Sequence, residues 1–105
     1  MKYFKLQSFW ADDCTFPDAF DTGTVISVDV DDLDKAYDMA IKEALKNIKP
    51  QIKPYIEKIE SMDGSVCLDW YATPSKNKTG YHEFVEISEA TQEEFDAQDT
   101  QLFLK

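Results

Sequence analysis

Residues 32–48 constrain the fold more than any other segment, because they form the one long stretch whose apolar residues recur at helical spacing. The intervals of three, four and seven residues place these side chains on one face of an α-helix. Asp31 or Asp32 can cap the first N–H groups, Asp34 suits the first turn, and Pro50 follows the last turn. We therefore predict one long helix in the middle of the chain. The apolar series is Leu33, Ala36, Tyr37, Ala40, Ala44, Leu45 and Ile48.

The segments on both sides of this helix alternate between apolar and polar residues, which is the pattern of a half-buried β-strand. The predicted strands are residues 2–10, 24–30, 65–72 and 80–88, with residues 100–104 as an edge strand. In the second of these strands, we expect Thr24, Ile26, Val28 and Val30 to face inward and Ser27 and Asp29 to face outward.

Shorter patterns predict the remaining elements. Pro54 opens an apolar-periodic stretch that ends near Gly64, and we predict a second, short helix there. Thr91 and Glu94 have the spacing of a capping box, which predicts one helical turn. Residues 11–23 are expected to form a loop, because they hold four Asp, one Pro and a closing Gly.

Together these elements predict an α+β fold in a single domain, residues 1–105. We expect an antiparallel sheet of about four to five strands, since the strands cluster in hairpins on either side of the helical segment. The long helix and the short helix are expected to pack on one face of that sheet.

The chain is strongly acidic, which excludes some classes of partner. Its 105 residues include 21 Asp or Glu against 11 Lys and no Arg, a formal net charge of −10. A nucleic-acid binder needs a cationic surface, so we expect no direct binding to DNA or RNA. Residues 11–34 hold eight Asp and no Lys, and residues 83–105 hold seven acidic residues and one Lys. Either these blocks only keep the protein soluble, or they form an anionic surface for a cationic partner.

The strands predicted at residues 65–72 and 80–88 give the most specific expectation. If their apolar sides coincide, Glu83 is the polar exception on the inward side. The outward side is polar but holds two aromatic residues, so it is either covered by the short helix or the Phe16 and Phe20 loop, or exposed to a partner. The inward side holds Val66, Leu68, Trp70, Tyr81, Val85 and Ile87. The outward side holds Cys67, Asp69, Tyr71, His82, Phe84 and Glu86.

These features favour a small acidic interaction module that binds and inhibits or regulates a cationic protein, such as a toxin or a nucleic-acid-processing enzyme. Immunity proteins and phage-encoded inhibitors have this size and charge, and an anionic surface can stand in for nucleic-acid phosphates. We expect no enzymatic activity, because no catalytic constellation is evident. A subunit of a homo-oligomer, with the exposed aromatic residues in its interface, is an alternative. The residues expected to bind the partner are Asp12, Asp13, Phe16, Asp18, Phe20, Asp21, Asp69, Tyr71, Phe84 and Glu86.

A second alternative is a ligand-binding or enzymatic domain that uses a divalent cation at Asp29, Asp31 and Asp34, because hard cations prefer oxygen ligands. The calcium-loop pattern is incomplete there, since it lacks a Gly and a distal Glu at the required spacing. Helix capping explains the same residues, and we expect no cofactor. Cys14 and His82 are the one conceivable thiol–imidazole pair, but the acidic loop around Cys14 disfavours a reactive thiolate.

Two cysteines cannot build a disulfide framework, which favours a reducing compartment. The sequence also has no apolar run long enough for a signal peptide or a membrane span. We therefore expect a cytoplasmic protein that does not bind membranes.

Overall fold

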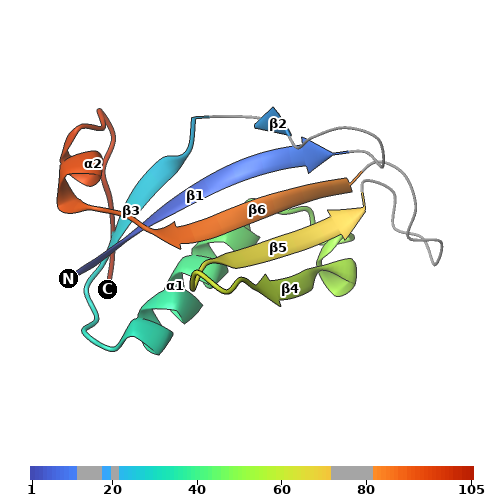
Figure 1. Ribbon diagram of the computed structural model, residues 1–105, viewed down its shortest axis with the longest axis horizontal. Coiled ribbons are helices and arrows are strands. Elements are labelled where there is room, and N and C mark those ends of the chain that lie inside the picture. Colours follow the sequence, from blue (N-terminus) through green and yellow to red (C-terminus); the bar gives the residue numbers. More distant parts are fainter. Residues whose placement is uncertain (12–17, 20–21, 72–81) are drawn as a thin grey trace.

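In the computed structural model, one long helix, α1 (Leu33–Lys46), lies across one face of a single mixed sheet, and the fold is α+β as predicted (Figure 1). The structure describes residues 1–11, 18–19, 22–71 and 82–105. The strands are β1 (Lys2–Ala11), β2 (Asp18–Ala19), β3 (Thr24–Val28), β4 (Glu57–Glu60), β5 (Val66–Tyr71), β6 (His82–Glu89) and β7 (Leu102–Leu104). Their order is β4-β5-β6-β1-β3-β7, and β2 pairs with the end of β1.

β1 is the interior strand around which the sheet is built. It pairs antiparallel with β6 along residues 4–11 and with β3 along residues 2–6. Beyond β3, the short strand β2 pairs with Phe9 and Trp10 of β1. β1 is therefore hydrogen-bonded along both edges over most of its length, and it joins β6 on one side to β3 and β2 on the other. β7 joins the far side of β3 as the one parallel pair in the described ranges.

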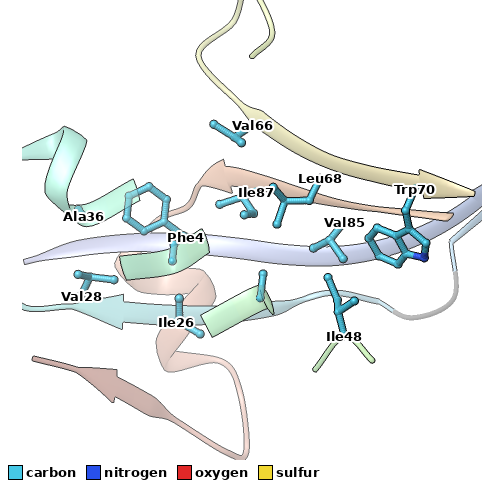
Figure 2. Packing of buried hydrophobic residues seen from close by; sticks show 12 residues of the cluster. Phe4, Ile26, Val28, Ala36, Ile48, Val66, Leu68, Trp70, Val85 and Ile87 are labelled. Carbon is cyan, nitrogen blue, oxygen red and sulfur yellow. The ribbon is translucent and has the colours of Figure 1, made fainter. Parts of the chain in front are cut away.

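The face of the sheet toward α1, which we call the inner face, carries the core (Figure 2). The helix presents only small side chains at its fully buried positions, Ala36, Ala40 and Ala44, so it lies close to the strands. Large side chains from the sheet fill the space, and the ring of Phe4 contacts that of Tyr37 at a centroid distance of 4.6 Å. The buried residues of this cluster are Phe4, Ile26, Val28, Ala36, Ala40, Ala44, Ile48, Val66, Leu68, Trp70, Val85 and Ile87.

A second, much shorter helix, α2 (Gln92–Asp96), covers one end of the opposite face of the sheet. Its capping box is formed as the sequence predicts, and it buries Phe95 to 3% exposure. The ring of Phe95 contacts Tyr3 at 5.3 Å and Phe103 at 5.2 Å. Ser27 lies in register between Tyr3 and Phe103, so its side chain is enclosed on this face. Ser27 faces away from α1, as predicted, but it is buried there, because a residue far along the chain covers it.

Gln98, just after α2, completes the edge of β3 where β7 does not reach. Its side-chain Oε1 accepts a hydrogen bond from the backbone N–H of Val25 at 2.6 Å, and its Nε2 donates to the Val25 carbonyl at 2.7 Å. The amide thus occupies both backbone groups that a neighbouring strand would use, and this fixes α2 against the sheet.

The second helix predicted between Pro54 and Gly64 is not present. One 3₁₀ turn, η1 (Lys53–Tyr55), is followed by strand β4, which pairs antiparallel with β5. The tight turn of the β4–β5 hairpin ends with a residue in the left-handed conformation. Gly64 adopts this conformation with φ +90°. The Ser61 N–H donates to the Ser65 carbonyl at 2.9 Å, and the Gly64 N–H donates to the Ser61 carbonyl at 3.0 Å.

Two other differences concern the loop predicted at residues 11–23. Asp18–Ala19 form the short strand β2, since their backbone pairs with β1, while Ala11 ends β1 itself. Residues 12–17 and 20–21 lie outside the described ranges.

We expect Ser27→Ala to stabilise the fold. The Ser27 hydroxyl is buried and has no hydrogen-bond partner among the described residues. Removing an unsatisfied buried hydroxyl should raise the free energy of unfolding by about 1 kcal/mol in urea denaturation. Ser65 is the matched control, because its buried hydroxyl donates to Asp63 Oδ1 at 2.7 Å, so that Ser65→Ala should destabilise. A loss of stability in Ser27→Ala would contradict the account.

Candidate functional site

The face of the sheet opposite α1 is the candidate site. We call its part over β4, β5, β6 and β1 the outer face, and the strand register arranges it as two rows of cross-strand neighbours. The first row runs Glu57, Asp69, Phe84, Phe9 and the second row runs Ile59, Cys67, Glu86, Gln7. Directly opposite residues on neighbouring strands have side chains on the same face, so these eight side chains share one surface.

Aromatic contact anchors the first row. The rings of Phe9 and Phe84 are stacked with centroids 5.0 Å apart and planes 11° from parallel. Neither residue is fully buried, so the pair offers a rigid apolar surface within the sheet. At the edge strand, Ile59 adds a second apolar element and is 45% exposed.

The outer face is anionic. Three of its eight side chains are carboxylates, and the nearest Lys on this face of the described strands is Lys5, which pairs with Ser88 one row away from Gln7. Burial, together with the negative charges of Asp69 and Glu86, raises the pKa of the Cys67 thiol to about 11. Burial is the larger cause, because it removes water from the thiolate, and the two carboxylates add repulsion. Cys67 therefore packs as a thiol and does not act as a nucleophile.

The structure brings together several residues that the sequence predicted for this surface. Asp69, Phe84 and Glu86 lie side by side in the two rows, and each is partly buried. Tyr71 pairs with His82 at the end of the same hairpin, and the structure describes only their backbones. For Asp18 likewise only the backbone is described, in β2. Asp12, Asp13, Cys14, Phe16, Phe20, Asp21 and Tyr81 lie outside the described residues.

Sequence reasoning missed four residues of this surface, Gln7, Phe9, Glu57 and Ile59. Phe9 belongs to the outward side of β1 by simple alternation, but its contact with Phe84 depends on the pairing of β1 with β6. Ile59 lies in the segment predicted as a short helix, which was one of the two possible covers of this face. As part of β4 it extends that face, because it pairs with Cys67.

Glu83, the polar exception on the inner face, has a hydrogen-bond partner. The indole Nε1–H of Trp70 donates a hydrogen bond to Glu83 Oε2 at 3.1 Å, which keeps the carboxylate on the apolar side. Both residues line a pocket of about 470 Å³ between the end of α1 and the sheet. Glu43 and Lys49 also line it, so its charged groups differ in sign and define no single class of ligand.

The acidic cluster before α1 is explained by backbone structure. Asp32 is the N-cap, and its Oδ1 accepts from the N–H groups of Asp34 and Lys35 at 2.9 and 3.3 Å. The Asp29 N–H donates to the Leu104 carbonyl at 2.8 Å, and the Asp31 carboxylate lies 4.0 Å from the N-terminal amine. Across the described parts of the chain, no three His, Cys, Asp or Glu residues are grouped to hold a metal ion.

No helix in the described residues is long and apolar enough to cross a membrane. Comparison of the sequence and fold with protein-family models, with curated proteins and with solved structures gives no match.

Substitution can separate capping from the other roles of the acidic cluster. Asp32→Ala should lower the free energy of unfolding by about 1 kcal/mol, because two N–H groups of the first helical turn lose their acceptor. Asp31→Ala removes the same charge from a neighbouring exposed site and should change stability by less than about 0.5 kcal/mol. Urea denaturation of both variants measures the difference, and equal effects would contradict the capping role.

The state of Cys67 can be tested by alkylation in a Cys14→Ser background. With a pKa near 11 instead of 9.0, the thiolate fraction at pH 8 falls about a hundredfold, and iodoacetamide should react correspondingly slowly. The rate should keep rising with pH up to about 11. The urea-unfolded protein is the control, with an ordinary midpoint near 9.0. A folded-state profile that levels off near pH 9 would contradict the raised pKa and the burial of the thiol that is its main cause.

Proposed function

We propose that this protein is a small interaction module that binds a cationic partner protein through the outer face and thereby inhibits or regulates it. The observation that carries the proposal is the arrangement of the two rows. A rigid aromatic pair and an exposed Ile lie among three carboxylates on a sheet face opposite the main helix. Aromatic anchors within a charged rim are a common composition of protein interfaces.

The proposed partner has a surface of matching chemistry. An apolar side chain would contact the Phe9 and Phe84 rings, and Lys or Arg side chains around it would pair with Asp69 and Glu86. The net charge of −10 would speed the encounter with such a partner, and salt would weaken the attraction. We extend the proposed surface to the partner-binding residues that follow β1 in sequence: Asp12, Asp13, Phe16, Asp18, Phe20 and Asp21.

The proposal favours a protein-like interface over imitation of a nucleic acid. Duplex DNA carries about one phosphate charge per 1.7 Å of its axis, so a mimic needs an unbroken series of carboxylates. In the first row, Glu57 and Asp69 are followed by two aromatic rings, and the second row has one carboxylate. Such a mixture suits a partner that offers both apolar and basic groups.

Affinity capture with a matched pair of charge variants tests the proposed surface. Wild-type bait is used to recover partners from the source cell, each is purified, and its dissociation constant is measured by calorimetry at two salt concentrations. Glu86→Lys, on the outer face, should weaken binding by about tenfold or more, because a like charge then faces the cationic partner. Asp38→Lys changes the net charge equally on the exposed surface of α1 and should have little effect.

Two results would contradict the proposed function. One is a purified partner whose affinity is reduced equally by Glu86→Lys and Asp38→Lys. The other is a dissociation constant that does not change with salt, since attraction between exposed charges is screened at high ionic strength.

A further inference from the structure

β4 is a terminal strand of the sheet within the described residues, and all four of its side chains are exposed. A strand in that position has one edge whose N–H and C=O groups are open to pairing with another strand. The register with β5 places Glu57 and Ile59 on the outer face and Lys58 and Glu60 on the inner face.

The hairpin turn shows which backbone groups point outward from this edge. The Ser61 N–H donates to the Ser65 carbonyl, in the same register as the β4–β5 pairing. Successive residues of a strand direct their backbone groups to alternate sides, so Ile59 and Glu57 also face β5. The backbone groups of Lys58 and Glu60 therefore face away from the sheet.

We propose that a second copy of this chain pairs antiparallel with β4, with Ile59 opposite Ile59 of the second copy. Lys58 of each copy then lies opposite Glu60 of the other. These are the residues whose backbone groups face outward, so each Lys58–Glu60 pair exchanges two backbone hydrogen bonds. The two Ile59 side chains meet on the outer face at the non-hydrogen-bonded position, where opposite side chains are closest.

Charge selects this register over its neighbours. A shift by one residue would turn the side chains of one copy to the wrong face, so only shifts by two residues compete. One of these shifts places Lys58 opposite Lys58 of the second copy, and the other places Glu60 opposite Glu60. Like charges directly opposite each other are destabilising, whereas opposite charges stabilise the pair.

Within one chain, Lys58 Nζ already lies 3.5 Å from Glu60 Oε1, and both side chains are well exposed. Charged side chains often protect an edge strand from pairing with other chains. Here the opposite signs of Lys58 and Glu60 permit one pairing, that of β4 with itself, in which each of these two charges meets its opposite. The dimer would continue the sheet and join the outer faces of two copies into one surface, independently of the proposed function.

Charge exchange tests the register. Sedimentation velocity over a concentration series should show wild-type protein dimerising, because β4 is self-complementary. Lys58→Glu alone and Glu60→Lys alone should each weaken dimerisation at least about tenfold, because each then places like charges opposite each other. The double variant Lys58→Glu/Glu60→Lys should dimerise like wild type. An equimolar mixture of the two single variants should form a heterodimer, because their charges are again complementary.

Cross-linking tests the position of the two-fold axis. In a Cys14→Ser/Cys67→Ser background, Ile59→Cys should give a disulfide-linked dimer under oxidised glutathione, since opposite residues lie within disulfide reach. Glu57→Cys is the control, because the proposed register sets its two copies too far apart for a disulfide. Circular dichroism confirms that each variant is folded.

The proposal is overturned if wild type stays monomeric at all concentrations and Ile59→Cys gives no linked dimer. It is also overturned if folded single charge variants dimerise as well as wild type. Neither outcome bears on partner binding, which Glu86→Lys tests on the body of the outer face.

Discussion

The pairing of β1 along both of its edges is the constraint on which the rest of the structure depends. β6 occupies one edge and β3 the other, and β2 adds to the second edge where β3 has ended. Because β1 is interior, its alternating side chains define both faces of the sheet. Phe4 and its inner neighbours meet the alanines of α1, while Tyr3 is covered by Phe95 of α2. Phe9 is left on the outer face, where it stacks on Phe84.

The two faces of the sheet are therefore unequal, and this inequality is the basis of the functional proposal. A long helix with small side chains covers the inner face, whereas among the described residues α2 covers the β1–β3 end of the opposite face. The rest of that face combines an aromatic pair, Ile59 and carboxylates, and the pKa of Cys67 is raised there mainly by burial and also by Asp69 and Glu86. The apolar rings of this surface favour contact with a partner, whereas its carboxylates oppose nonspecific association.

Much of this arrangement follows from the sequence, and the exceptions have physical causes. Alternation fixed the sides of the β5–β6 hairpin, because a strand has only two faces and an apolar set on one of them sets the register. The sequence pattern could not show that Glu83 accepts a hydrogen bond from Trp70, because this contact depends on the exact cross-strand pairing. The helix expected before Gly64 was wrong because a short apolar stretch fits either period, and the hairpin turn decided for a strand. The burial of Ser27 was not predicted because its cover comes from Phe95, beyond the reach of any local pattern.

Residue-resolved hydrogen exchange at low protein concentration tests the central place of β1 most directly. Amides in β1 and β6 should exchange most slowly in the chain, at the rate of global unfolding, because these strands are paired on both sides. The amides of Lys58 and Glu60 should exchange much faster than those of β1, because their N–H groups face away from the sheet. Exchange in β1 as fast as in β4 would contradict the account, because the interior position of β1 would then give its amides no protection.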